Sequence, residues 1–154
     1  TFTVDNNAAL WKKRIAVTKG TTAEALVMRL KTEQNLELLY VDSNEAGLES
    51  VEKGAADGYA QDDILLYGLI GESKLKDKLT VTGRFLSVEP YALMLPKGDV
   101  PFREVVDKTM LALMSSGEML QIYNKWFNTD KLRVPMNNYM KDNLRFPNKY
   151  GIPG

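Results

Sequence analysis

Residues 14–24 read Arg-Ile-Ala-Val-Thr-Lys-Gly-Thr-Thr-Ala-Glu, and this stretch decides the fold class. Its first five residues contain the apolar run Ile15-Ala16-Val17 and two β-branched aliphatic residues, which predicts a buried strand. Lys19-Gly20 breaks that strand. Thr21 or Thr22 can then cap a helix, and Glu24 suits the positive end of its dipole. The stretch predicts the opening of an α/β architecture.

The same alternation continues along the chain. Residues 36–41 and 58–61 are expected to form two further strands, and each is followed by a pattern typical of a helix. This strand–helix order, repeated three times, predicts parallel strands joined by right-handed crossovers.

The second half of the chain gives mostly helical signals. Two short runs, 79–82 and 91–95, are predicted as later strands. Pro101 fits the first turn of a long helix, and Ser115 with Glu118 has the spacing of a capping box for the next helix. That helix is expected to bury Trp126-Phe127. A short helix is predicted near residues 139–144, and the first residues, 1–4, resemble a strand.

Composition limits the classes of function. The 154 residues include 44% apolar and 26% charged residues, and Lys+Arg and Asp+Glu are both 20. This balance gives no basic footprint for nucleic acid. The absence of cysteine and histidine removes thiol catalysis, disulfides and Cys/His zinc sites. No segment approaches the ~18 apolar residues of a membrane span. We expect no cofactor and no catalytic residues.

The turn over residues 18–22 is the first candidate site. Its glycine and the following helix N-terminus present backbone N–H groups, and the hydroxyls of Thr18, Thr21 and Thr22 add neutral donors around Lys19 and Gly20. Such a turn suits a carboxylate. The alternative is that Thr21 or Thr22 only caps the helix.

Asp62-Asp63 forms the second candidate site, just after Gln61 at the end of a strand. Ligands of open α/β sheets bind outside the carboxyl ends of the strands. One carboxylate can take an ammonium group, while the other caps the next helix. Both aspartates can equally be caps, and the pair offers too few ligands for a metal ion.

Asn44 is the third candidate, because it also follows a predicted strand end. It is interpreted either as a helix cap or as a polar ligand contact.

Taken in order, these motifs resemble the amino-acid-binding proteins of ABC importers (solute-binding protein family 3), in particular the glutamate/aspartate subgroup. The matching stretches are 14–24, 48–54 (Leu-Glu-Ser-Val-Glu-Lys-Gly), 57–63 (Asp-Gly-Tyr-Ala-Gln-Asp-Asp), 87–91 (Ser-Val-Glu-Pro-Tyr), 115–118 and 124–127. The resemblance runs from about Arg14 to the C-terminus.

The resemblance implies a type II periplasmic-binding-protein fold with two lobes. Residues 1–13 would be a hinge-like strand and a shortened connection, and 14–88 the second lobe. Residues 89–154 would be the return crossing, the C-terminal helices of the first lobe and a tail. The N-terminal part that builds most of the first lobe in the family is expected to be missing.

The resemblance also implies roles for the candidate residues. Thr18 and Thr21, with their neighbouring amides, would hold a carboxylate of the ligand, and Asp62 would pair with its α-ammonium group. Asn44 stands where relatives place a further polar contact, which can be histidine, so it is expected to alter the preference for the ligand's side chain.

The expected function is therefore capture of glutamate or aspartate for a membrane permease, in the periplasm or at the outer face of a membrane. One alternative is a lyase- or dehydratase-like enzyme on the same fold, for which only Asp62, Asp63 or Glu89 could act as acid or base. The other is a truncated remnant that binds nothing and self-associates to complete the missing lobe.

Overall fold

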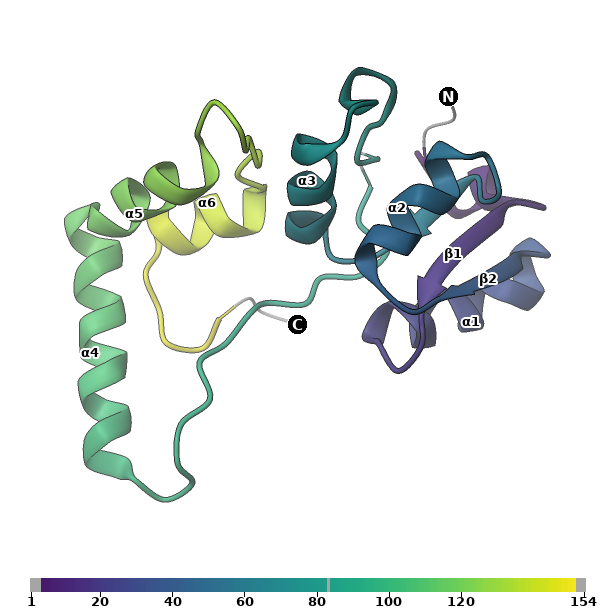
Figure 1. The fold of residues 1–154 in the computed structure, drawn as a ribbon. Coiled ribbons are helices and arrows are strands. Elements are labelled where there is room, and N and C mark those ends of the chain that lie inside the picture. The colour runs from purple at the N-terminus through teal and green to yellow at the C-terminus, as the bar shows by residue number, and fades with distance from the viewer. Residues whose placement is uncertain (1–3, 83, 152–154) are drawn as a thin grey trace. The chain divides into compact units, whose positions relative to one another are not determined.

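The computed structural model describes residues 4–82 and 84–151 (Figure 1). The chain divides into two compact units, Thr1–Val88 and Glu89–Gly154. The further expectation, that these are parts of two lobes of one binding protein, stays a prediction.

The first unit alternates strands and helices as the sequence predicts. Its elements are η1 (Asn7–Leu10), β1 (Arg14–Thr18), α1 (Thr22–Gln34), β2 (Glu37–Val41), α2 (Asn44–Glu52), β3 (Gly58–Ala60), α3 (Asp63–Glu72) and η2 (Lys76–Lys78). Asn35 ends α1 in the left-handed conformation, at φ 50°, and an asparagine tolerates this conformation better than most residues do.

The three strands form one parallel sheet in the order β2-β1-β3. Thr18 pairs with Val41 of β2, and Val17 pairs with Ala60 of β3. The prediction of three parallel strands is confirmed, with β2 beginning one residue later and β3 ending one residue earlier than expected. Because both pairings are parallel, the carboxyl ends of all three strands lie at the same end of the sheet.

The hydrophobic core of this unit lies between β1 and α1. Ile15 and Val17 point to one face of the sheet, where they cluster with Val27 and Leu30 of α1. Ala16, which points to the other face, is fully buried. Burial on both faces explains why β1 is a continuous apolar run rather than an alternating one.

The second unit is helical: α4 (Val100–Ser116), α5 (Glu118–Phe127) and α6 (Asn138–Arg145). Asp99 caps α4 through the N–H of Phe102, and Pro101 lies in its first turn as expected. Gly117, at φ 81°, ends α4 and precedes α5. The predicted capping box is wrong, because Ser115 continues α4 instead of opening a new helix.

Two further predictions need correction. Residues 79–82 and 91–95 do not form strands, because within the described residues they find no partner with which to build a hydrogen-bonded ladder. Trp126 is not buried: its exposed fraction is 62%. The strand expected at residues 1–4 lies outside the described residues except for Val4, which is buried.

Among the described residues, none of the helices combines the length and the apolar character needed to cross a bilayer.

Candidate functional site

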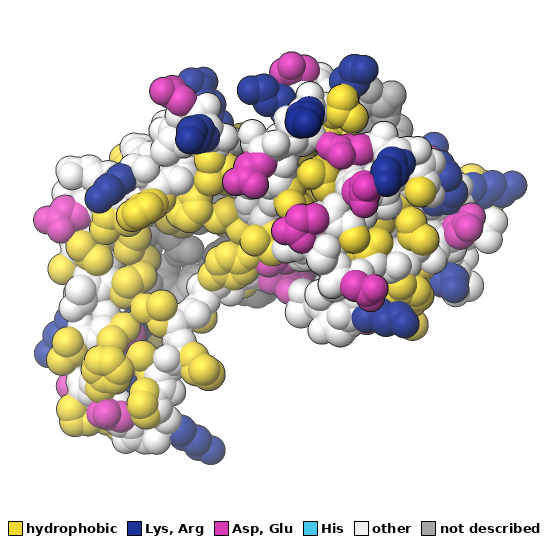
Figure 2. All heavy atoms as spheres, viewed as in Figure 1, with side chains coloured by type: hydrophobic (Ala, Val, Ile, Leu, Met, Phe, Trp, Pro, Cys, Tyr) yellow, Lys and Arg dark blue, Asp and Glu magenta, His cyan; other side chains and the backbone are white. Residues whose placement is uncertain are grey.

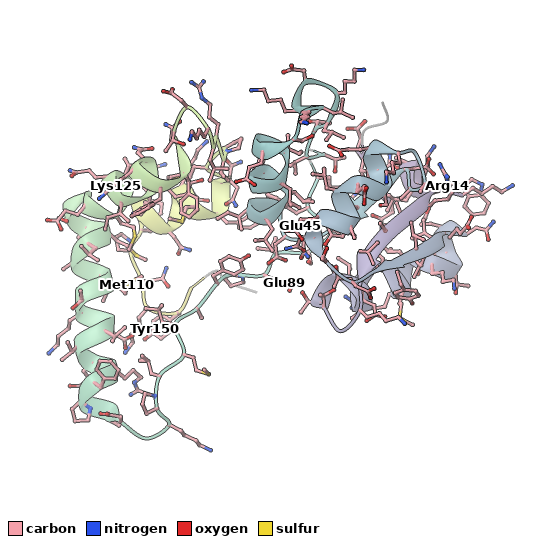
Figure 3. The ribbon with its side chains drawn as sticks, viewed as in Figure 1. Arg14, Glu45, Glu89, Met110, Lys125 and Tyr150 are labelled. Carbon is pink, nitrogen blue, oxygen red and sulfur yellow. The ribbon has the colours of Figure 1, made fainter. Side chains whose placement is uncertain are left out.

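The candidate residues lie at the carboxyl end of the sheet. The turn after β1, the N-terminus of α2 and the N-terminus of α3 all begin at this end, because the strands are parallel and in register. Glu45, in the first turn of α2, marks it in Figure 3, and Arg14 marks the opposite end of the sheet. The sheet thus brings three chain segments together that are about twenty residues apart in sequence.

Gly20 makes the turn after β1 possible. Its φ is +76°, a conformation that strains a residue with a side chain. The turn leads into α1, whose N-cap is Thr21: the Thr21 hydroxyl accepts from the N–H of Glu24 at 3.1 Å. The capping role that the sequence left open therefore belongs to Thr21, while Thr22 is the first helical residue.

The hydroxyls of Thr18 and Thr21 both contact other groups of the protein. The Thr21 hydroxyl donates to the carbonyl of Thr18 at 2.7 Å. The Thr18 hydroxyl lies 3.0 Å from the hydroxyl of Tyr59. The backbone N–H groups of Thr22 and Ala23 remain as donors for an anion, because these amides in the first turn of α1 have no intrahelical acceptor.

A carboxylate of the chain itself already occupies part of this turn. The N–H of Gly20 donates to Oε2 of Glu24 at 2.7 Å. This contact shows that the turn binds a carboxylate oxygen through its backbone. It also places a negative charge beside the amides that a ligand carboxylate would use.

The side chain of Lys19 turns away to a neighbouring strand. Its Nζ lies 5.1 Å from the ring centroid of Tyr40 on β2, within cation–π distance. Lys19 therefore offers the turn its backbone rather than its charge.

Asn44 is not a helix cap, because Ser43 caps α2 through the N–H of Ala46. The Oδ1 of Asn44 instead accepts from the hydroxyl of Tyr59 at 2.8 Å and from Nε2 of Gln61 at 2.9 Å. Asn44 and Gln61, both candidates from the sequence, are thus brought into direct contact.

Tyr59 was not a candidate from the sequence, yet its hydroxyl contacts three of the candidate residues, Thr18, Asn44 and Gln61. Its hydroxyl also lies 3.1 Å from Nε2 of Gln61. Its ring packs on α2 where the chain carries Gly47: a Cβ at that position would lie 2.5–2.7 Å from three ring atoms. A helical glycine facing a strand tyrosine was the signal in the sequence that could have revealed this contact.

The two aspartates have different surroundings. Asp62 stands at the N-cap of α3 without a side-chain capping bond, and its N–H donates to Oε1 of Gln61 at 3.0 Å. Asp63 lies in the first turn, where Oδ1 accepts from the N–H of Ile64 at 2.8 Å. Of the two carboxylates, Asp62 is therefore the one not engaged in capping.

A bidentate ion pair of the first unit lies away from these residues. Arg14, at the start of β1, donates from Nη2 and Nε to the carboxylate of Asp57, at 2.8 and 3.3 Å. These hydrogen bonds lower the pKa of Asp57 and raise that of Arg14. The pair holds the amino end of the sheet together and belongs to the framework.

Burial raises the pKa of Tyr67 in α3, with a smaller contribution from the charge of Asp63. Over residues 4–82 and 84–151, no group of three or more acidic, histidine or cysteine side chains is placed to hold a metal ion.

Comparison with solved structures identifies the fold. The chain matches a periplasmic binding protein of an ABC transporter from Brucella ovis, with glutathione bound, at a TM-score of 0.63 and 22% identity, covering 90% of this chain and 43% of that one. It matches an ancestral arginine-binding protein bound to arginine at a TM-score of 0.62 and 21% identity, covering 82% and 56%. The chain has the type II periplasmic-binding-protein fold over the part that these matches cover.

Sequence comparison identifies the relatives more narrowly. The chain is 32% identical over 143 residues to the L-glutamate/L-aspartate-binding protein of Pseudomonas aeruginosa, covering 88% of this chain and 47% of that protein. It is 34% identical over 122 residues to the glutamate/aspartate import solute-binding protein of Escherichia coli, covering 78% and 40%. No family model matches the chain.

The chain is thus related to the amino-acid-binding proteins of ABC importers, and among them to the glutamate/aspartate subgroup. It spans about half the length of the relatives it matches. These relatives are named as binding proteins and not as enzymes.

Proposed function

We propose that this chain forms the ligand-holding part of an extracytoplasmic amino-acid-binding protein, which takes glutamate or aspartate and delivers it to an ABC permease. The observation that supports this proposal most directly is the Gly20 N–H bound to the carboxylate of Glu24. In this contact the backbone of the turn holds a carboxylate oxygen of the chain itself, at the carboxyl end of the strands, where open α/β sheets bind their ligands.

In this proposal the ligand is held by its charges. The first-turn amides of α1, at Thr22 and Ala23, take the α-carboxylate at the positive end of the helix. Asp62 takes the α-ammonium group by a charge-assisted hydrogen bond. Asn44 contacts the ligand's side chain. The remaining capture step is closure of two lobes around the ligand by hinge motion.

The names of the relatives support the acidic ligand. The relatives from Pseudomonas aeruginosa and Escherichia coli, both above 30% identity, bind or import glutamate and aspartate according to their names. The ancestral arginine-binding protein, at 21% identity, carries no such weight.

The test is an NMR titration of the chain with glutamate, aspartate, glutamine and arginine, because chemical-shift changes reveal even millimolar affinities. We expect the acidic pair to bind best, and shifts to cluster on the turn at residues 18–22 and on Asp62. Asp62→Asn should weaken glutamate binding by about 1–3 kcal/mol, since it leaves the ammonium without its charged partner. Binding of arginine alone would refute the acidic assignment.

A second candidate function, self-association, is favoured by the apolar surface of residues 89–154. Figure 2 shows apolar side chains gathered over α4 and α5. The exposed fractions are 61% for Val105, 62% for Trp126 and 97% for Met94, which is unusual for large apolar side chains of a monomer. Light scattering separates the two candidates: a self-associating remnant grows in mass with concentration and shows no amino-acid-dependent shift at residues 18–22.

A further inference from the structure

We propose that a chain of hydrogen bonds through Gln61, Tyr59 and Asn44 fixes the direction of the Asn44 amide, so that its NH2 group is the donor left for a ligand. The site then selects amino acids whose side chain ends in a hydrogen-bond acceptor. This inference rests on the proposed function and assigns its side-chain specificity to named atoms.

The chain of bonds begins at a group whose direction is certain. The backbone N–H of Asp62 can only donate, and it lies 3.0 Å from the side-chain amide oxygen of Gln61. The oxygen of Gln61 must therefore face Asp62, and its NH2 group must face the other way. The two ends of a side-chain amide are otherwise assigned only from such networks.

The NH2 group of Gln61 then sets the direction of Asn44. Nε2 of Gln61 lies 2.9 Å from the near atom of the Asn44 amide, and two NH2 groups facing each other would leave both without an acceptor. The near atom is thus Oδ1. No hydrogen bond from Nδ2 of Asn44 is found within the described residues, so both of its protons remain to be used.

The Tyr59 hydroxyl completes the hydrogen-bond network that fixes the Asn44 amide. Because Oδ1 of Asn44 only accepts, the Tyr59 hydroxyl must donate its single proton to it, over 2.8 Å. The Tyr59 oxygen then accepts from Thr18, 3.0 Å away, and from Gln61, 3.1 Å away. The hydroxyl is held by three side chains, and its ring has no room to withdraw across Gly47.

Two chemical consequences follow for the ligand. Asn44 presents two N–H donors, which suit a carboxylate or an amide oxygen and repel an ammonium or guanidinium group. The proton of Thr18 is spent on Tyr59, so the Thr18 oxygen can only accept. The α-carboxylate of the ligand is then held by the backbone amides of the turn rather than by the hydroxyl of Thr18 or Thr21, and Tyr59 acts as a positioning residue that does not itself touch the ligand.

Glutamate and norvaline provide the matched pair of ligands that tests this inference, because norvaline lacks only the side-chain carboxyl group. We expect the wild-type chain to prefer glutamate, and Asn44→Asp to reduce that preference at least tenfold. Aspartate keeps an oxygen for Tyr59 and Gln61 but replaces the outward donor by an anionic acceptor. Asn44→Asp should correspondingly bind lysine better than the wild type does.

The coupling between substitutions at Tyr59 and Asn44 tests the positioning role of Tyr59. Tyr59→Phe keeps the ring on Gly47 and removes only the hydroxyl, so the glutamate preference should fall about fivefold. In an Asn44→Ala background the same change should have no effect on the preference, since the group that it positions is gone. Equal effects of Tyr59→Phe in the two backgrounds would overturn the positioning role.

The outcomes separate this inference from the proposed function. If the wild type prefers glutamate and Asn44→Asp leaves the preference unchanged, the inference fails and the proposed function stands. If no amino acid binds, the proposed function fails, and the direction of the amides is still tested by NMR. The Nε2 protons of Gln61 should exchange with water more slowly than the Nδ2 protons of Asn44. The reverse order would refute the assigned direction of the two side-chain amides.

Discussion

Replacing Gly47 by alanine should destabilise the protein, against the usual effect of this change in a helix. A Cβ at position 47 would lie 2.5 Å from the nearest ring atom of Tyr59, so the ring would have to retreat by about 1 Å to reach an ordinary van der Waals distance. The Tyr59 hydroxyl, held at 2.8–3.1 Å by three side chains, resists that movement.

The size of the effect follows from three contributions. Overpacking of this kind costs about 1–3 kcal/mol, and loosening the Tyr59 hydrogen bonds costs about 1 kcal/mol more. The higher helix propensity of alanine returns about 1 kcal/mol. We therefore expect Gly47→Ala to lower the free energy of unfolding by about 1–3 kcal/mol, measured by urea denaturation followed by circular dichroism.

Two controls separate the steric effect at Gly47 from the general effect of alanine in a helix. A Cβ at Gly68, within α3, would meet nothing within 4 Å, so Gly68→Ala should stabilise the chain by about 0.5–1 kcal/mol. In a Tyr59→Val background, which removes the ring tip, Gly47→Ala should become stabilising by a similar amount. The steric reasoning is refuted if Gly47→Ala stabilises the wild type as much as Gly68→Ala does.

Three further predictions concern stability and the turn. Asp57→Asn should flatten the acid limb of the stability curve: since Arg14 lowers the pKa of Asp57 in the folded state, the wild type gains stability above about pH 4 that it loses as pH falls through the lowered pKa. Parallel acid limbs for wild type and variant would contradict this. Thr21→Ala should cost about 1 kcal/mol of stability through loss of the cap on Glu24, and unchanged urea midpoints would count against it. Glu24→Gln should strengthen glutamate binding several-fold in calorimetry by removing the carboxylate from the Gly20 N–H, whereas weaker binding would show that Glu24 only supports the turn.

The strands of the first unit were predictable because their residues determine them locally. The run at 14–18 contains apolar and β-branched residues. After it, Gly20 favours a turn and Thr21 favours the N-cap of a helix. Residues 79–82 and 91–95 carry a similar local signal but form no strands. A strand also needs a partner, and the partner is a property of the whole fold.

The candidate site, too, was predictable only where local sequence determines it. The positions of Gln61 and Asp62 follow from the end of a strand, and the sequence predicted them. It could not decide whether Asn44 caps α2 or contacts a ligand, because asparagine caps helices as well as serine does, and the cap is Ser43. Tyr59 was missed because a tyrosine in a strand usually packs, and nothing local announces that its hydroxyl joins two other strand ends. Trp126 was predicted to be buried because it belongs to the apolar stripe of a helix. Such a stripe predicts burial, but it does not say whether the described residues include the segment that covers it.

The order of the strands in the sheet has a consequence for how the chain is made. Of the three strands of this sheet, β1 carries the most deeply buried apolar run and is the first to be synthesised, yet it lies between its partners. The backbone carbonyl of Arg14 receives its bond from the N–H of Asp57, so β1 must wait while some forty more residues are synthesised. During that interval Ile15, Ala16 and Val17 are exposed, and they form the segment that a chaperone would have to protect.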